Sequence, residues 1–330
     1  MNAGDPAIEA HHLTKRFGAT TAVDDVDLAV RAGELFGLLG PNGAGKTTVV
    51  RMLTGLVPIT SGTAKVAGID VARDPDGVRR ALGVVPQALT SDLDLTGYEN
   101  MDIHARYFGV DRATRRARIE ALLRRVGLWD RRKSLVKTYS GGMRRRLEIA
   151  RGLIHKPRVL FLDEPTIGLD PQSRRVIWDL LRDLRRGDEL TISLTTHYLD
   201  EADALCDRVA IIDRGRVIAL GTPAELKSKV PGSDTITLLL PHAVSDGVLR
   251  EVEAMPGVRE VRRSDEGLVI RADDGGELLP RLLDGLRRRE VTVASVSLAR
   301  VTLEDTFIYF TGRSLREEAP LRRPPPPPRF

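Results

Sequence analysis

The sequence predicts an α/β fold built on a parallel sheet, and three observations support this prediction. The stretch from Gly40 to Thr47 reads Gly-Pro-Asn-Gly-Ala-Gly-Lys-Thr and fits G-x-x-x-x-G-K-[ST], the phosphate-binding P-loop pattern. An apolar run before it, Glu34 to Leu39, is typical of a buried parallel strand, and the spacing after it is compatible with a helix. A second apolar run, Arg158 to Leu162, leads directly into two adjacent carboxylates.

The P-loop chemistry follows from its residue types. We expect the glycines at positions 40, 43 and 45 to adopt positive φ and to bring backbone N–H groups close to phosphates. The helix that follows points the positive end of its dipole at the same anion. Lys46 can neutralise the β- and γ-phosphates, and the Thr47 hydroxyl can bind Mg²⁺. The predicted nucleotide-binding residues here are Gly40, Pro41, Asn42, Gly43, Ala44, Gly45, Lys46, Thr47 and Thr48.

Composition is that of a soluble globular protein of two domains. The 330 residues are 42% hydrophobic and 29% charged, with a net charge of +5. Because acidic residues are interspersed throughout, the basic balance favours an arginine-rich genome or a membrane surface, and no nucleic acid is expected. Cys206 is the only cysteine, which excludes an intrachain disulfide and indicates a reducing cytosol. No signal sequence and no apolar run near the ~20 residues of a membrane helix is visible.

The segments around the P-loop read as short strands. Residues 7–13 and 21–30 are predicted strands, with Phe17 between them. Phe17 has two open interpretations, loop packing and stacking on an adenine ring. Another strand is predicted at 61–66, and a fourth, beginning at Leu82, ends at Gln87 because Pro86 prevents its continuation. Gln87 is either a surface residue or a ligand that supplies a neutral oxygen to Mg²⁺.

Residues 96–137 change to a helical pattern with apolar residues on one face. The arginines from Arg112 to Arg132 indicate a solvated surface, with lipid headgroups as the alternative partner. Ser140 is a suitable N-cap for the helix that follows, and Gly141 and Gly142 make its start a second candidate anion site.

The strand that follows this helix ends in Asp163 and Glu164, at the sheet edge where α/β proteins bind ligands. Strand alternation predicts that the two carboxylates point in opposite directions, so one can support Mg²⁺ while the other accepts a proton from water. Residues 165–171 are predicted as a loop before a helix to 186. A further buried strand begins at Leu190 and ends beside His197, which is either structural or a partner of the γ-phosphate. Residues 209–213 and 216–220 read as a hairpin.

A boundary is predicted near residues 228–234, where Val-Pro-Gly-Ser interrupts the pattern. Beyond it, segments in the order βαββαβ and a final helix at 303–310 predict a small α+β domain over 234–312. The arginine- and proline-rich tail, 313–330, is predicted to be disordered.

With these motifs in order, residues 7–230 resemble the ATPase cassette of ABC transporters. The resemblance implies a RecA-like core, an antiparallel β subdomain and an α-helical subdomain at about 96–140. The resemblance also assigns roles to single motifs. It implies that Gly40–Thr47 is the Walker A motif and that Leu160–Glu164 is the Walker B strand. It further implies that Phe17 is the aromatic residue that stacks on adenine and that Gln87 is the Q-loop glutamine. The other matched positions are the signature core Ser140, Gly141 and Gly142, the magnesium-side Asp163, the general base Glu164, the D-loop Asp170 and the H-loop His197.

Three positions depart from the family pattern. Tyr139 and Met143 replace the outer leucine and glutamine of the signature, and Ile167 replaces a small residue before the D-loop. The Ser-Gly-Gly core is intact, so we expect activity to survive. The run from Tyr139 to Arg146, the Thr-Thr-His-Tyr-Leu-Asp-Glu-Ala-Asp stretch and residues 302–307 resemble the daunorubicin/doxorubicin resistance ATPases of actinobacterial exporters.

The resemblance implies a homodimer in which ATP and Mg²⁺ lie between one P-loop and the partner's signature residues. It also implies a separate membrane permease at the cytoplasmic face of a bacterial membrane, and a drug-like small molecule as cargo. The alternatives are an ABC ATPase acting on ribosomes or nucleic acid, which usually has two cassettes or coiled-coil insertions, and an ATPase regulated by a ligand of residues 234–312. A GTPase is disfavoured because no Asn-Lys-x-Asp motif is present.

Overall fold

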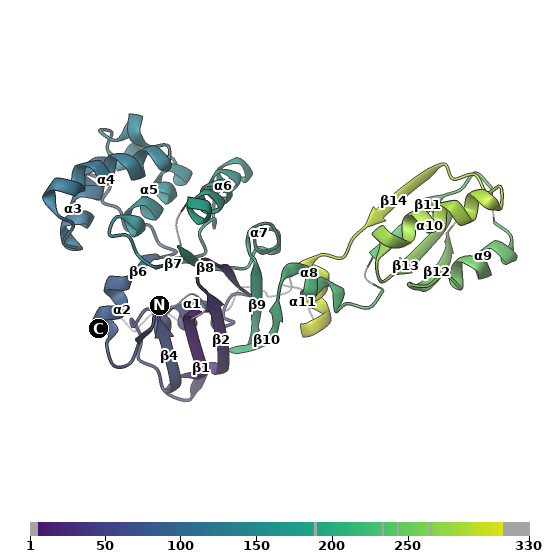
Figure 1. Ribbon diagram of the computed structural model, residues 1–330, viewed down its shortest axis with the longest axis horizontal. Helices are drawn as coiled ribbons and strands as arrows, with labels where there is room; N and C mark the ends of the chain where they lie inside the picture. The colour runs from purple at the N-terminus through teal and green to yellow at the C-terminus, as the bar shows by residue number, and fades with distance from the viewer. Residues whose placement is uncertain (1–5, 188–189, 233, 243, 265, 313–330) are drawn as a thin grey trace, which may run out of the picture. The chain divides into compact units, whose positions relative to one another are not determined.

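The computed structural model describes residues 6–187, 190–232, 234–242, 244–264 and 266–312 (Figure 1). The chain divides into two compact units, Met1–Thr222 and Pro223–Phe330. Helix α8 (Pro223–Ser228) belongs to the second unit because it packs on helix α11 (Leu303–Thr311). The division therefore falls before the boundary predicted near 228–234. The predicted tail, 313–330, lies outside the described residues.

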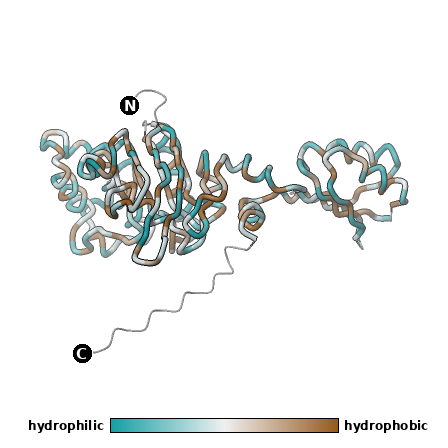
Figure 2. The backbone as a smooth tube through the Cα atoms, turned by 90° about the horizontal axis from the view of Figure 1, so that it is seen from below, coloured by the Kyte–Doolittle hydropathy of each residue, from teal (hydrophilic) through white to brown (hydrophobic). Residues whose placement is uncertain are grey.

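The first unit is organised by a sheet whose inner strands are buried along most of their length. Across the sheet the strands are β10 (Arg216–Gly221), β9 (Arg208–Asp213), β3 (Leu35–Leu39), β8 (Thr191–Thr196), β7 (Val159–Asp163) and β6 (Leu82–Val85). Neighbouring strands are parallel except for β9 and β10, which form the predicted antiparallel hairpin. Many hydrophobic residues, brown in Figure 2, lie in the interior of this unit, where they form a buried core. Such a core is expected for a largely parallel sheet.

The register of this sheet brings three sequence motifs to one edge. Leu39, the last residue of β3, pairs with Thr196 of β8, and Asp163 of β7 pairs with Thr195. Because parallel strands end at the same edge, the P-loop after β3, the carboxylates after β7 and His197 after β8 become neighbours.

A second, antiparallel sheet packs on the P-loop helix α1 (Lys46–Leu53). Its strands are β2 (Thr20–Arg31), β1 (Pro6–Phe17), β4 (Ser61–Val66) and β5 (Ile69–Asp70). In β2 the buried residues alternate with exposed ones along most of its length, so one face supplies core residues. The same hydrophobic core contains Val49 and Met52 of α1 and Phe161 of β7, and α2 (Pro75–Ala81) leads back to β6.

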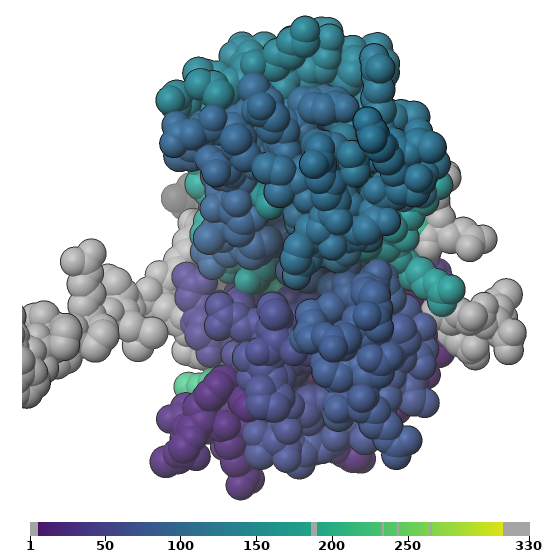
Figure 3. Space-filling model, turned by 90° about the vertical axis from the view of Figure 1, so that its left-hand side faces the viewer, coloured from purple at the N-terminus to yellow at the C-terminus, as the bar shows by residue number. Residues whose placement is uncertain are grey.

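Helices α3 (Gly97–Tyr107), α4 (Arg112–Arg125) and α5 (Gly141–Leu153) gather in a lobe of their own (Figures 1 and 3). Each begins at a residue whose side chain accepts a backbone N–H: Thr96, Asp111 and Ser140. Helices α6 (Pro171–Gly187) and α7 (Leu199–Leu205) follow the β7 and β8 loops. Within the described ranges, none of the helices has both the length and the apolar character needed to cross a membrane.

The second unit contains the predicted βαββαβ order. Its elements are β11 (Asp234–Leu239), α9 (Asp246–Glu253), β12 (Val258–Ser264), β13 (Gly267–Ala272), α10 (Gly275–Arg288) and β14 (Ser295–Ala299). The strands form an antiparallel sheet in the order β12-β13-β11-β14, and α9 and α10 supply much of its core. The Thr302–Asp305 capping box starts α11, so this part of the 302–307 stretch acts as a helix N-terminus.

Candidate active site

The P-loop glycines serve two different structural purposes. Gly43 and Gly45 have φ values of 81° and 106°, in the left-handed region that favours glycine. Gly40 is absent from the positive-φ residues, so the prediction of positive φ there was wrong. A Cβ at Gly40 would lie 2.1 Å from the carbonyl oxygen of Ile212 on β9. Gly40 is therefore required because a neighbouring strand approaches closely.

Lys46 is the first residue of α1 and is buried inside the loop that precedes it. Its Nζ donates to the carbonyl oxygens of Gly40 and Pro41, at 2.7 and 2.9 Å. The N-cap of α1, Gly45, makes no side-chain hydrogen bond to the helix start. The first N–H groups of α1 therefore have no capping side chain, as in phosphate-binding helix N-termini.

Thr47 and Asp163 bring two oxygen ligands together from separate elements. The Thr47 hydroxyl donates to Asp163 Oδ1 at 3.2 Å, and Thr195 Oγ1 donates to the same oxygen at 2.5 Å. Hydroxyl and carboxylate oxygens are the donor types that Mg²⁺ prefers. The residues predicted to hold the metal therefore fit that ion in their chemistry.

Glu164 lies just beyond the end of β7, which stops at Asp163, and its φ is 47°. Strand alternation consequently does not extend to Glu164, and the prediction that the two carboxylates point in opposite directions was wrong. Both carboxylates contact consecutive residues of α1: Asp163 binds Thr47, and Glu164 Oε1 lies 3.6 Å from Lys46 Nζ. The positive φ turns Glu164 back toward the P-loop.

The environment of Glu164 favours its ionised form. Its Oε2 lies 3.0 Å from His197 Nδ1. Burial by itself would raise the pKa of Glu164, but His197 and Lys46 together hold that pKa below its ordinary value. An ionised carboxylate is the form that a general base needs at neutral pH.

Two predicted residues have exposed side chains. Gln87 follows β6 and is exposed, while its carbonyl oxygen accepts from Arg145 at 3.0 Å. Phe17 ends β1 with 51% of its surface exposed, and Lys15 Nζ lies 4.9 Å from its ring centroid. Both interpretations of Phe17, loop packing and adenine stacking, therefore stay open.

The signature residues lie against α6. Ser140 is exposed and caps α5 by accepting from Met143 N at 3.3 Å. A Cβ at Gly142 would lie 2.8 Å from Ser173 Oγ, and this same hydroxyl donates to Asp170 at 2.7 Å. Ser140, Gly142 and Asp170 thus share the junction of α5 and α6, while the P-loop cluster is built around α1.

The departures in the signature have structural explanations. Tyr139 is buried, and its hydroxyl donates to the carbonyl oxygen of Arg131 at 2.8 Å. Gly97 leaves the space for this ring, since a Cβ there would lie 2.3 Å from the hydroxyl. Met143 contributes its backbone N–H to the Ser140 cap, which any residue except proline can do.

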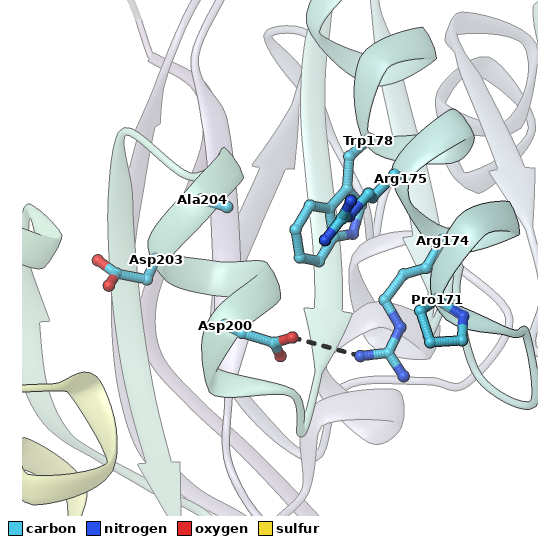
Figure 4. A pocket seen from close by; sticks show the side chains of 7 residues that line it. All are labelled: Pro171, Arg174, Arg175, Trp178, Asp200, Asp203 and Ala204. Atoms are coloured by element: carbon cyan, nitrogen blue, oxygen red, sulfur yellow. Dashed lines mark hydrogen bonds and ion pairs between the residues drawn. The ribbon is translucent and has the colours of Figure 1, made fainter.

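A cavity of about 460 Å³ opens between α6 and α7 (Figure 4). Trp178 lines it, and Arg174 Nη1 lies 3.3 Å from Asp200 Oδ2 across it. The guanidinium of Arg174 also lies 4.2 Å from the Tyr198 ring centroid. None of its lining residues belongs to the predicted site.

Sequence reasoning missed Arg145 of α5, which is 3% exposed and contacts both Gln87 and Glu164 through their backbones. It stands in a run of arginines, a pattern more typical of a solvated face. No local signal distinguishes the buried member of such a run.

Comparison with known proteins shows which family the chain belongs to. The family model described as "ABC transporter" matches residues 23–167, and the model for the C-terminal domain of DrrA1-3-like ATP-binding proteins matches residues 221–311. The chain is 47% identical to the daunorubicin/doxorubicin resistance ATP-binding protein DrrA of Streptomyces peucetius, covering 93% of this chain and 92% of that protein. It is 41% identical to the Nod factor export ATP-binding protein I of Ralstonia nicotianae, over 94% and 96% of the two chains.

Two solved structures extend the comparison. The cbiO1 protein of Clostridium perfringens, part of the ABC transporter complex cbiONQ, is 29% identical with a TM-score of 0.63, covering 67% of this chain and 90% of that one. The ATP-binding cassette MJ0796, a dimer bound to ADP and Pi, is 25% identical with a TM-score of 0.59, covering 65% and 98%.

The sheet order and the residues gathered at its edge are those of a P-loop ATPase: the P-loop, the Asp163–Glu164 pair and His197 lie at one edge of the sheet. The chain belongs to the ABC transporter family, as an ATP-binding subunit of the DrrA-like group.

Proposed function

We propose that this protein hydrolyses ATP to power export of a drug-like small molecule through a separate membrane subunit. The observation that carries the proposal is the cluster of Lys46, Glu164 and His197 at the P-loop, which places a cation and a proton acceptor together. Export is supported by the relatives, whose names record resistance to daunorubicin and doxorubicin, resistance to linearmycin, and Nod factor export.

Each residue of the cluster has a proposed role. The backbone N–H groups of residues 40–48 other than Pro41, together with the Lys46 ammonium, bind the phosphates of ATP, and Phe17 stacks on the adenine. Thr47, Asp163 and Gln87 would hold Mg²⁺, which when bound neutralises charge on the phosphate oxygens. Glu164 accepts the proton of the attacking water, and His197 keeps that carboxylate ionised and oriented.

The proposed site is completed by a second copy of the chain. Ser140 is exposed at a helix N-terminus, and Asp170 lies in the same junction at the start of α6. Such a helix start suits a γ-phosphate held by the partner's P-loop. ATP would then hold two subunits together, and hydrolysis would release them, which provides a cycle that can drive a permease at the cytoplasmic face of the membrane.

The decisive test is Glu164→Gln in the full-length chain, which keeps the size of the side chain and removes its ability to accept a proton. We expect loss of turnover by about 10²- to 10⁴-fold with ATP binding retained, and accumulation of an ATP-bound dimer. Asp179→Asn on α6, which removes a carboxylate that pairs with Arg182 at the protein surface, is the control. Hydrolysis near the wild-type rate in Glu164→Gln would refute the assignment.

Export needs its own experiment. Vesicles containing this chain and its membrane subunit should show ATPase activity stimulated by an anthracycline, and the stimulation should disappear with Glu164→Gln. Stimulation by ribosomes instead would favour the translation-linked alternative. Drug binding to the chain with no change in ATPase rate would favour a ligand-sensing role for residues 234–312.

A further inference from the structure

Arg145 is a buried cation that contacts three backbone carbonyl groups of two separate loops. It is 3% exposed on α5, and it donates to Pro86 O at 2.7 Å, to Gln87 O at 3.0 Å and to Glu164 O at 3.2 Å. A guanidinium provides five N–H donors in a planar fork, so it can bridge carbonyls that point at it from different elements. The bridge joins the backbones of the proposed metal ligand and the proposed general base.

The next turns of α5 bind the backbone N–H groups of the loop that follows Gln87. Glu148, also 3% exposed, accepts from Thr90 N at 3.0 Å and from Ser91 N at 2.6 Å. Its second oxygen accepts from the Thr90 hydroxyl at 2.8 Å, and Arg151 donates to both Glu148 and Thr90. Buried charges paired by several hydrogen bonds are costly to separate, so this contact is stiff.

Residues 145, 148 and 151 are spaced three apart on one helix and therefore share a face. We call this face, Arg145, Glu148 and Arg151, the α5 clamp. It holds the loop 86–91 by carbonyl groups at one end and by N–H groups at the other. The same helix begins at Ser140, one to two turns before Arg145. The loop that carries Gln87 is consequently attached to the helix that carries the proposed partner-facing serine.

The geometry points to Arg145 as a positioning residue of ATP hydrolysis. It couples the placement of Ser140 at the start of α5 to the backbone positions of Gln87 and Glu164. Binding of the partner's nucleotide at Ser140 would thereby align the proposed metal ligand and general base of the subunit that carries this Ser140. The inference rests on the proposed roles of Gln87 and Glu164.

The neighbouring arginine provides a matched control. Arg146 follows Arg145 on the same helix and also donates from a half-buried guanidinium to a carbonyl oxygen, that of Val126, at 2.7 Å. Its described hydrogen bond joins α5 to the end of α4 and does not involve either catalytic loop. Removal of either arginine disturbs packing of α5, but only removal of Arg145 frees the loops that carry Gln87 and Glu164.

The test compares Arg145→Gln with Arg146→Gln in the full-length chain, by steady-state ATPase kinetics and by ATP binding. We expect Arg145→Gln to lower kcat by about 10- to 100-fold while KM for ATP changes less than about threefold, because the P-loop is untouched and catalytic groups are misplaced. Arg146→Gln should keep kcat within about threefold. Arg145→Lys should recover only part of the loss, because an ammonium cannot reproduce the planar fork. Equal kcat values for the two glutamine variants would overturn the inference.

A double-mutant cycle with Gln87→Ala separates positioning from general destabilisation. If Arg145 acts by placing Gln87, Arg145→Gln should lower kcat by a factor that is at least about threefold smaller in the Gln87→Ala background than in the wild type. The same reduction of kcat in both backgrounds would overturn the inference. If Arg145→Gln does not fold, Arg145→Lys carries the same cycle. Failure of the proposed function and failure of this inference give different results. If the proposed function is wrong, Glu164→Gln keeps its turnover. If only the inference about Arg145 is wrong, Glu164→Gln is inactive and Arg145→Gln is active.

Discussion

Replacement of Gly40 by alanine tests whether close approach of a strand, and not backbone conformation, requires glycine at the start of the P-loop. The added Cβ would lie 2.1 Å from Ile212 O and 3.3 Å from Ala44 Cβ. Contacts under 3.0 Å essentially do not occur for real Cβ atoms. The P-loop and β9 must therefore separate by roughly 1 Å, a misplacement that costs on the order of 10²-fold in rate in a positioned site.

The separation also affects stability. Strand β9 pairs with β3 directly before the P-loop, at Leu38↔Ala210 and Leu39↔Ile211. Overpacking at such a junction typically costs about 1–3 kcal/mol of unfolding free energy. We expect Gly40→Ala to show weaker ATP binding, a kcat reduced by roughly 100-fold, and a lower midpoint in urea denaturation.

The control is Gly43→Ala, where a Cβ meets nothing within 4 Å and only the φ of 81° is unfavourable. That strain costs about 1–2 kcal/mol without displacing a neighbouring strand. Gly40→Ala should therefore be the more damaging of the two for ATP binding. Wild-type ATP affinity and stability in Gly40→Ala would show that β9 does not restrict the residue at position 40.

Two further predictions concern Glu164, the proposed general base, and the C-terminal unit. In His197→Ala the pKa of Glu164 should rise, because burial raises it and Lys46 would be the remaining group that lowers it. The acid limb of the profile of kcat/KM against pH should then move to higher pH. An acid limb at the wild-type pH would contradict the assignment of Glu164 as general base. In Thr302→Ala the α11 capping box with Asp305 is lost, so unfolding of the C-terminal unit by urea should require about 1 kcal/mol less, and an unchanged midpoint would show that the cap contributes nothing.

Much of the fold was predictable because its signals are local. A glycine loop between a buried run and a helical pattern predicts the β3–P-loop–α1 unit whatever the rest of the chain does. The C-terminal βαββαβ order was likewise predicted from alternation and turn residues, and the structure confirms it. In both cases the information lies within a few residues of the element it determines.

Errors arose where one residue breaks a local rule for a distant reason. Gly40 was expected to need positive φ, but its constraint comes from Ile212 on another strand. Glu164 was expected to follow strand alternation, yet its φ of 47° turns it toward Lys46. Arg145 was indistinguishable from Arg144 and Arg146 beside it, because burial of one arginine depends on loops nearly sixty residues before it and nineteen after it.

Residue type and short spacing were sufficient to predict the family, the P-loop, the carboxylate pair and the residues that follow each strand. Which of these residues meet in space depends on the tertiary structure. Strand β8 lies between β3 and β7, and this order brings His197 to Glu164 and Asp163 to Thr195. Strand order depends on how long segments pack together, and no local pattern records it. The packing of Gly142 of α5 against Ser173 of α6 depends on tertiary structure in the same way.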